Sequence, residues 1–368
     1  AILVQVAIVL SLGCLCSAFL SVFPPYGPWT ASISSARLAP LPGLHGFERR
    51  AIVRQIHHVR LQSSSKSLHE TPKRASTVAR SIKVIFSDVD GTLLNSQHAL
   101  SSETVDAIHA AMRQNITFVM ATGKARGGWV QDLREELGFT DEGFTINGPG
   151  VFIQGLLVCD QNGTAVKQLL LPNPAVKLIN AFSDRHRLTV IAYTTGDGIA
   201  CAQTDQYTDI LRVYNEPVPA SIGRAGMNLL GSGRGQPDVY KMILLGPEPK
   251  LAGLRAELEA VTADKMAVTK AMDGMLEILP PGASKASGVA HAMELLGVDA
   301  SSCLAMGDGE NDLEFLRMIR EGGGVAVAMS NGVSSTKAEA SFVAASNDED
   351  GAAQAIRRFA LGRATSGE

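Results

Sequence analysis

The stretch "KVIFSDVDGTLLN", from Lys83 to Asn95, contains an apolar run that ends in two carboxylates, a glycine and a threonine. The run is short and does not alternate with polar residues, which is typical of a strand buried on both faces of a parallel sheet. Asp88 and Asp90, at positions i and i+2 near the strand end, can point into one pocket. Their repulsion is costly unless a cation or a shared proton offsets it. The stretch therefore predicts a buried strand with a charged site at its end.

Three later runs repeat this pattern: "ITFVMATGK" (116–124), "CLAMGDGEND" (303–312) and "GVAVAMSNG" (324–332). Helical patterns at 101–115 and 285–297 lie between such runs; the first opens on serine caps and the second ends at Gly297, a predicted C-cap. Alternating strands and helices predict an α/β fold with a Rossmann-like, doubly wound parallel-sheet core. Sites in such folds gather beyond the C-terminal strand ends, where these polar clusters lie.

The middle of the chain reads differently. The segments 187–205, 238–246 and 265–280 favour strands of an antiparallel sheet, the segments 173–186 and 249–261 favour helices, and the Gly-rich "GRAGMNLLGSGRGQPD" (223–238) favours a loop. We interpret residues 166–275 as an inserted α+β cap domain. The core then consists of two parts, 82–165 and 276–365.

Composition and charge narrow the class of protein. The chain has 368 residues, of which 45% are hydrophobic and 19% charged, and its net charge is −3. These values are ordinary for a soluble α/β protein, and no basic stripe with interleaved aromatics indicates a nucleic-acid partner. The five cysteines form no C-x-x-C pair. The three outside the leader are odd in number and scattered, so we predict neither a zinc site nor a disulfide framework.

The first 81 residues have the composition of a targeting sequence. Residues 1–23 are apolar and uncharged, and we interpret them as a signal peptide cleaved near "CSA" (16–18), with a signal anchor as the alternative. Residues 24–81 are basic and Ser-rich, as transit peptides are, and we expect them to be disordered. A signal followed by a transit segment resembles the bipartite presequences of algae with complex plastids, where a phenylalanine such as Phe19 follows the cleavage point. We therefore expect a plastid location, with a secretory-route compartment or the cytoplasm as alternatives, and no membrane partner for the mature domain.

A second acidic cluster, "GDGEND" at 307–312, supplies Asp308, Glu310, Asn311 and Asp312 at the end of a later strand. Acidic residues from two strand ends are suited to a hard cation such as Mg²⁺, which prefers oxygen ligands. The predicted metal ligands are Asp88, Asp90, Asp308 and Asp312. An anionic substrate, most simply a phosphate, would fill the remaining coordination positions.

Other residues have the chemistry that a phosphate needs. Thr122 offers a hydroxyl, Gly123 allows close approach of the backbone, and Lys285 places a cation near a helix start. Thr122 alone, or Lys285 alone, is better explained by a cap or surface role. Their order along the chain carries the prediction.

These four pieces resemble the ordered motifs of the haloacid dehalogenase superfamily, and most closely those of its Cof-type phosphatases. The pieces are Asp88–Thr92, Thr122–Gly123, Lys285 and Gly307–Asp312, supported by "NGPGVFI" (147–153), "YKMILLG" (240–246), "LEILPPGASK" (276–285) and "VAMSNG" (327–332). The resemblance covers about residues 82–365. The interval from Asp90 to Thr122 is too short for an inserted domain, whereas the interval from Thr122 to Lys285 is ample, and a cap in that interval matches Cof-type members.

The resemblance implies a role for each residue. Asp88 is the nucleophile, Asp90 the general acid and base, and Lys285 neutralises the phosphate and Asp88. Mg²⁺ is the cofactor, and the backbone carbonyl of Asp90 is one of its ligands. The residues implied to bind phosphate or substrate are Thr122, Gly123, Lys124, Thr92 and Asn311, and Thr92 is also expected to orient Asp90. The chain departs from the family at Lys124, where arginine is frequent, and at Ala286, where glycine is.

The implied function is a Mg²⁺-dependent phosphatase that hydrolyses small phosphomonoesters through an aspartyl-phosphate. Its partner is a small phosphorylated metabolite: a sugar phosphate, or a cofactor such as FMN or pyridoxal phosphate. The alternatives are a sucrose- or trehalose-phosphate phosphatase, a phosphotransferase and a non-catalytic phosphosugar-binding regulator. Specificity is expected in the cap loops 193–207 and 222–237. For Asn147 and Asn331, the sequence favours a contact with phosphate or the cation and a structural role in a turn equally.

Overall fold

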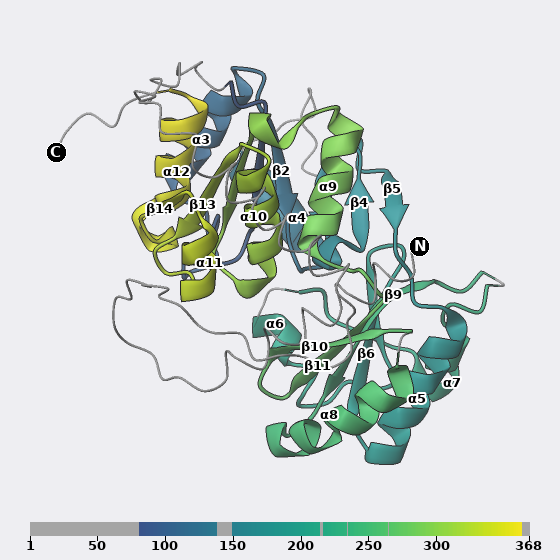
Figure 1. Ribbon diagram of the computed structural model, residues 1–368. Helices are drawn as coiled ribbons and strands as arrows, with labels where there is room; N and C mark the ends of the chain where they lie inside the picture. The colour runs from purple at the N-terminus through teal and green to yellow at the C-terminus, as the bar shows by residue number, and fades with distance from the viewer. Residues whose placement is uncertain (1–80, 138–148, 214–215, 234, 264, 363–368) are drawn as a thin grey trace, which may run out of the picture. The chain divides into compact units, whose positions relative to one another are not determined.

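A computed structural model describes residues 81–137, 149–213, 216–233, 235–263 and 265–362 (Figure 1). The predicted leader and the transit-like segment lie outside this range except for Ser81, and Asn147 also lies outside it. Within the described range, no helix is both long enough and apolar enough to cross a membrane.

An eight-stranded sheet, here called the core sheet, is built around the first strand of the sequence analysis. Its order is β14 (Phe342–Ala344), β13 (Val325–Met329), β12 (Cys303–Gly307), β1 (Val84–Ser87), β2 (Thr117–Ala121), β3 (Gly150–Phe152), β4 (Leu157–Cys159) and β5 (Ala165–Gln168). The strands are parallel from β14 to β3, and β4 and β5 run antiparallel at one edge. The four apolar runs supply β1, β2, β12 and β13, as predicted.

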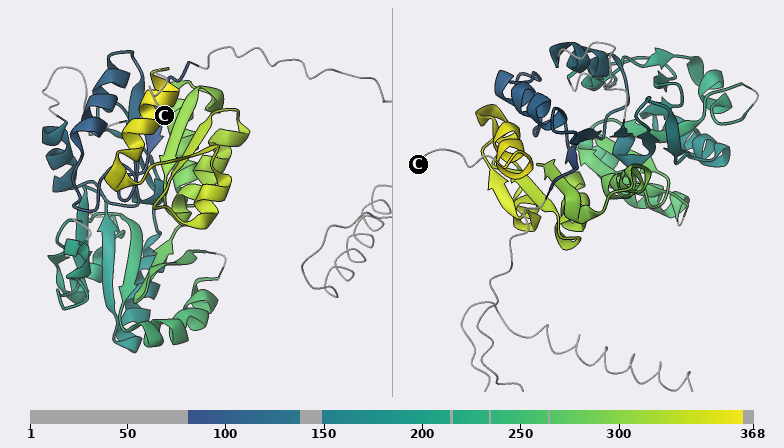
Figure 2. Two further views of the ribbon diagram at one scale, coloured as in Figure 1. Left: turned by 90° about the vertical axis from the view of Figure 1, so that its left-hand side faces the viewer. Right: turned by 90° about the horizontal axis from the view of Figure 1, so that it is seen from above.

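Helices cover both faces of the core sheet (Figure 2). One face carries α3 (Ser102–Met112), α4 (Gly128–Glu136) and α12 (Gly351–Ala355), and the other carries α9 (Lys285–Leu296), α10 (Leu313–Glu321) and α11 (Ser334–Glu339). Alternate residues of β1 point into the two layers: Ile85 packs with α3 and α4, whereas Val84 and Phe86 pack with α9 and α10. The predicted doubly wound parallel-sheet core is confirmed.

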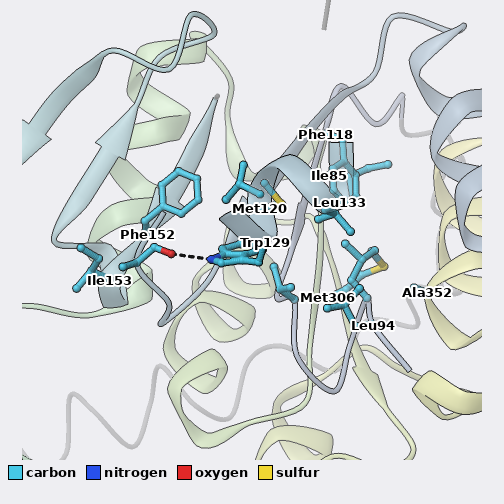
Figure 3. Packing of buried hydrophobic residues seen from close by; sticks show 14 of the residues in the cluster. Ile85, Leu94, Phe118, Met120, Trp129, Leu133, Phe152, Ile153, Met306 and Ala352 are labelled. Carbon is cyan, nitrogen blue, oxygen red and sulfur yellow. Dashed lines mark hydrogen bonds between the residues drawn. The ribbon is translucent and has the colours of Figure 1, made fainter. Parts of the chain in front are cut away.

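The layer beneath α3 and α4 is close-packed at the strand that leads to the second motif (Figure 3). Met120 and Phe118 of β2 lie against Trp129 and Leu133 of α4. The Trp129 indole nitrogen donates to the Ala125 carbonyl oxygen at 2.7 Å. This contact fixes the start of α4 relative to the loop that follows β2.

A second sheet of six strands, here called the cap sheet, has the order β10 (Ala267–Met272), β11 (Met275–Leu279), β9 (Val239–Leu245), β6 (Thr189–Thr194), β7 (Gly198–Cys201) and β8 (Ala220–Ser221). It is antiparallel, as predicted, except that β8 runs parallel to β7. On one face it packs against α5 (Asn173–His186), α7 (Gly223–Leu229) and α8 (Glu248–Thr262), and α6 (Ile210–Val213) follows β7. The opposite face carries Tyr193, Ile243 and Met275, which join the hydrophobic cluster of α4 and β2.

Two expectations about this middle region need correction. The Gly-rich stretch predicted as a loop contains helix α7, because Met227 is buried against α5 and its carbonyl accepts a hydrogen bond from the Asn180 side chain at 3.0 Å. The expected boundaries at 165/166 and 275/276 both fall within strands. β5 belongs to the core sheet up to Gln168, and β11 belongs to the cap sheet up to Leu279, since strand pairing decides both positions and is invisible in one sequence.

Candidate active site

The predicted site residues come from three neighbouring strand ends. β1 lies between β12 and β2, so Asp88 and Asp90, Thr122 to Lys124, and Asp308 to Asp312 all follow strands that end at the same edge of the sheet. Lys285 opens helix α9, whose first turn is fixed by a capping box between Ser284 and Ser287. The fold thereby brings together the four motifs that the sequence separates.

Asp88, Lys285 and Asp312 form a buried ionic triad. The Lys285 ammonium donates to a carboxylate oxygen of Asp88 and, at 2.7 Å, to Oδ1 of Asp312. Lys285 is 1% exposed and Asp312 is fully buried, so neither charge is solvated by water. A buried charge at this depth is tolerated only when it is paired, and one lysine pairs both carboxylates.

The surroundings raise the pKa of the carboxyl groups of Asp88, Asp308 and Asp312. Burial raises the pKa of Asp88 to about 6, against the opposing effect of Lys285, and also raises the pKa of Asp312 to about 6. The pKa of Asp308 is raised by burial and by the nearby Asp312 charge. Burial lowers the pKa of Lys285, but Asp312 and Asp88 together outweigh it, so the net direction is upward. Three neighbouring carboxylates, those of Asp88, Asp308 and Asp312, therefore face the single ammonium of Lys285.

Asp88, Asp308 and Asp312 are the carboxylates that could share a cation. One ligand atom from each lies within 4.8 Å of the others, and a close approach to Asp308 is possible because Gly91 has no Cβ; an added Cβ would lie 2.5 Å from Oδ2 of Asp308. Carboxylate oxygens at this spacing, with raised pKa values, are suited to a hard divalent cation.

Asp312 is already saturated by hydrogen bonds from the protein. Its Oδ1 accepts from Lys285, and its Oδ2 accepts from the backbone N–H groups of Asp308 at 2.9 Å and of Gly309 at 2.8 Å. It lies among the predicted metal ligands, but its bonds hold the Asp308 loop and Lys285 in position.

Thr92 requires a correction. It was expected to bind phosphate and to orient Asp90, but its hydroxyl donates to Oδ1 of Asp308 at 3.0 Å, and its side chain is buried. The chain turns at Gly91, where φ is +77°, and this turn directs the hydroxyl toward β12. The sequence shows the turn but not the direction of the residue after it.

Asp90 is held by Lys124. The Lys124 ammonium lies 2.6 Å from Oδ1 of Asp90, and both residues border a cavity of about 290 Å³. Lys124 is itself buried beside the Trp129 ring, with its nitrogen 5.5 Å from the ring centroid. The contact of Lys124 with substrate stays a prediction. In the structure, Lys124 forms an ion pair with Asp90.

Thr122, Gly123, Asn311 and one residue that the sequence analysis missed, Gln154, line the same cavity. The Gln154 side-chain oxygen accepts from Asn311 at 3.3 Å. Gln154 has φ of +57° and the preceding residue, Ile153, has φ of +51°. Two successive residues other than glycine in the left-handed conformation cost conformational free energy. No sequence signal marked this position, because left-handed conformations are usually announced by glycine or asparagine. Asn331 serves a turn: its amide nitrogen donates to the Gly91 carbonyl at 2.8 Å.

The rest of the cavity wall comes from the cap sheet, from α6 and from Glu216 in the segment after α6. The lining residues from this side are Tyr193, Leu211, Glu216, Lys241, Ile243, Met272, Met275 and Glu277. Of the two loops expected to set specificity, only Tyr193 contributes to this lining, and no described residue of 222–237 does. The expectation about the loops is corrected because alternate residues of β9 and β11, such as Lys241 and Ile243, point to the cavity. The face of the cap sheet, and not its loops, therefore lines the cavity.

Comparisons with known proteins show the family of this chain. Residues 85–356 match the model of the haloacid dehalogenase-like hydrolase family. The chain belongs to this family. The Cof-type membership, the fold class and the class of enzyme predicted from the sequence are confirmed by it and by the relatives.

Three relatives illustrate the likeness. A chloroplastic endoribonuclease of Arabidopsis thaliana is 34% identical over 279 residues, which cover 75% of this chain and 46% of that protein, so the chain spans about half the length of this relative. A 5-amino-6-(5-phospho-D-ribitylamino)uracil phosphatase of Escherichia coli is 28% identical and covers 75% of this chain and 95% of its own length. The crystal structure of a haloacid dehalogenase-like hydrolase from Bacteroides thetaiotaomicron is 26% identical, with a TM-score of 0.65 over 75% of this chain and 99% of its own.

Proposed function

We propose that this chain is a Mg²⁺-dependent phosphatase that hydrolyses small phosphomonoesters through an aspartyl-phosphate on Asp88. The observation that carries the proposal is the position of Asp88: a buried carboxylate that faces the cavity, with Lys285 and Asp308 beside it. The set of residues supports catalysis over the non-catalytic regulator, because a binding protein needs no nucleophile beside an acid.

The residues that would hold Mg²⁺ are Asp88, Asp308 and the backbone carbonyl of Asp90. We assign Asp312 a positioning role in place of the direct ligation first expected, since its oxygens already accept three hydrogen bonds. Thr92 would orient Asp308 in the same way. A bound Mg²⁺ would offset the repulsion among the carboxylates and stabilise charge on the transferring phosphoryl group.

The chemistry of the protein's own residues follows in two steps. The Asp88 carboxylate attacks phosphorus, the bond from phosphorus to the alcohol oxygen breaks, and Asp90 donates a proton to that oxygen. Asp90 then takes a proton from water as the water attacks the aspartyl-phosphate, which releases phosphate and restores Asp88. Thr122, the Gly123 backbone amide and Lys285 would hold the phosphate oxygens, as phosphoryl transfer depends mainly on positioning and charge stabilisation.

The candidate substrates are sugar phosphates and phosphorylated cofactors such as FMN or pyridoxal phosphate. The cavity of about 290 Å³ adjoins a second one of about 810 Å³, and Gln154, Glu277, Gly309 and Asn311 line both, so the volume excludes none of these candidates. The Escherichia coli relative is named for a phosphorylated ribitylaminouracil, and a compound of this kind belongs in the first substrate panel. Sugar phosphates, pyridoxal phosphate and FMN complete the panel.

The test measures phosphate release by the purified chain from a panel of phosphomonoesters, with Mg²⁺ and with EDTA. Asp88→Asn is expected to lower the rate by at least about a thousandfold, because an amide is a poor nucleophile. Asp106→Asn, an exposed position on α3, serves as the matched control and should retain full activity. Release that survives in Asp88→Asn would overturn the covalent mechanism.

We also propose delivery to a plastid by residues 1–81. The chloroplastic location in the name of the Arabidopsis relative supports this, together with the composition of the leader. Residues 1–81 fused to a fluorescent protein should enter the plastid of an alga with complex plastids, and Phe19→Ala should hold the fusion outside it. Fluorescence of the unaltered fusion in the cytoplasm would contradict the proposal.

A further inference from the structure

The cap side of the cavity contains a buried ion pair in the middle of the cap sheet. Lys241 of β9 and Glu277 of β11 are 2.7 Å apart and are 3% and 6% exposed. Their strands are neighbours, and both side chains line the cavity. A buried ion pair is often no more stabilising than an apolar pair of the same volume, so stability alone does not account for it.

Glu216 adds a second carboxylate to this wall. Its Oε1 accepts from the Tyr193 hydroxyl and its Oε2 from the Ala125 backbone N–H of the core, both at 3.3 Å. These hydrogen bonds are long, and no described lysine or arginine forms an ion pair with Glu216 within 4 Å. Burial raises the pKa of Glu216 to about 7, so above that pH its carboxylate adds negative charge to the cavity without a cation bonded to it.

Each of the three lysines at the cavity, Lys124, Lys241 and Lys285, already forms an ion pair with a carboxylate of the protein. Lys124 is paired with Asp90, and Lys285 with Asp88 and Asp312. Lys241 is paired with Glu277, and its nitrogen lies 4.5 Å from the centre of the Tyr193 ring. On the cap wall, two carboxylates thus face one lysine, and the remaining wall is apolar, from Leu211, Ile243, Met272 and Met275.

We propose that this wall selects phosphomonoesters whose alcohol part is neutral or cationic and carries hydrogen-bond donors, and that it excludes alcohols with a second anionic group. The inference rests on the proposed function and adds the class of leaving group. Hydroxyl or amino groups of such an alcohol would donate to Glu216 and Glu277, while its carbon skeleton would lie against the apolar side chains. A carboxylate or second phosphate would meet uncompensated negative charge in a site of low dielectric.

The experiment compares substrates in pairs that differ in one group. Sorbitol-6-phosphate and 6-phosphogluconate are both acyclic and differ at C1, and glucose-6-phosphate and glucosamine-6-phosphate differ at C2. The values of kcat/KM for both pairs are measured at pH 7.5 with the full chain and Mg²⁺. Inhibition constants against p-nitrophenyl phosphate replace them where turnover is slow. We expect the carboxylate-bearing compound to be at least about tenfold poorer than the neutral one, which corresponds to about 1.4 kcal/mol, and the amine to be at least as good as the neutral compound.

Two variants assign the effect to residues. Glu216→Gln should raise kcat/KM for the carboxylate-bearing compound, and so lower the ratio of kcat/KM between the neutral and the carboxylate-bearing compound severalfold. Lys241→Met combined with Glu277→Leu removes the pair without leaving a lone charge, and should weaken binding of the neutral sugar while p-nitrophenyl phosphate is still hydrolysed. Glu259→Gln, on α8 at the opposite face of the cap sheet, is the control and should change nothing.

The outcomes are separable. Equal values for the neutral and carboxylate-bearing compounds, with phosphate released from either, would overturn this inference and leave the proposed function intact. A preference that persists unchanged in both variants would overturn the assignment to Glu216 and Lys241–Glu277. Absence of phosphate release from every compound by a folded protein, p-nitrophenyl phosphate included, would overturn the proposed function and the inference with it.

Discussion

Lys285 compensates the negative charge of two buried carboxylates, Asp88 and Asp312, by forming an ion pair with each. Lys285→Met should leave Asp88 and Asp312 without a counter-charge and lower the free energy of unfolding by about 3–5 kcal/mol. Urea unfolding at neutral pH measures this loss. Lys250→Met, at an exposed position on α8, is the control and should stay within about 0.5 kcal/mol of the unaltered chain. A loss below about 1 kcal/mol for Lys285→Met would mean that the triad is not formed as described.

Thr92 allows a test of metal binding against phosphate binding. Its hydroxyl donates to Asp308, so Thr92→Val should raise the Mg²⁺ concentration for half-maximal activity by about tenfold or more. Thr92→Ser keeps the hydroxyl and should behave like the unaltered chain. The measurement is a Mg²⁺ titration of phosphate release at saturating substrate. A higher KM for the substrate with an unchanged Mg²⁺ response would instead favour the phosphate contact that the sequence suggested.

At the level of elements, helix α9 owes its position to two glycines. A Cβ on Gly288 would lie 2.5 Å from Cγ1 of Val151 in β3 and 2.7 Å from Cα of Gly155, so the backbones of Gly288 and Gly155 lie close together. Gly288→Ala should push α9 away from the sheet and move Lys285 at its first position. We expect a loss of about 1–3 kcal/mol in stability and at least a tenfold loss in kcat.

The C-terminal end of the same helix supplies the control. Gly297 has φ of +61° and open space where a Cβ would be. Gly297→Ala should cost about 1 kcal/mol in stability through the left-handed conformation and leave kcat unchanged. Thermal unfolding and kcat are measured on both variants. Equal loss of kcat in the two would show that general destabilisation, and not the position of Lys285, explains the effect.

Elements with an apolar run and a distinct end were predictable from the sequence. The strands around β1 and the helices α3 and α9 agree with the expected segments because local signals, such as a serine cap or a C-terminal glycine, mark their limits. Helix α7 was missed because its glycines predict a loop. The helix is stabilised by the burial of Met227, which the sequence does not show. Lys241 within β9 gave no functional signal, since its partner Glu277 is distant in sequence and adjacent only through strand pairing.

For the whole molecule, the core half of the site was predictable and the cap half was not. Ordered motifs indicated the residues at the strand ends, because parallel strands bring their ends to one edge whatever the details. The cap wall depends on which face of the cap sheet meets the core, and a single sequence does not encode that choice in any short pattern. Glu216 therefore emerged only from the three-dimensional arrangement. Gln154, on the core side, was missed for another reason, because no glycine or asparagine marks its left-handed backbone.

Glu216 links the cap to the core, and its ionisation should affect the stability of the described unit. Burial raises its pKa from 4.5 to about 7, although Lys241, the Ala125 N–H, Lys124 and the Tyr193 hydroxyl all act in the opposite direction. The folded chain thus binds this proton more tightly than the unfolded chain does. Between about pH 4.5 and 7, rising pH removes stability, and above pH 7 the full cost of the buried charge is present.

Glu216→Gln should remove this cost while keeping an oxygen for the Ala125 N–H. The variant should match the unaltered chain below pH 4.5 and exceed its free energy of unfolding above pH 7, by at most about 3 kcal/mol. Urea unfolding at pH 5 and pH 8 measures the difference, with Glu259→Gln as the exposed control that should show none. A variant that is less stable by the same amount at both pH values would show that the carboxylate stabilises the junction of cap and core through its hydrogen bonds, and that its charge is not held at a cost.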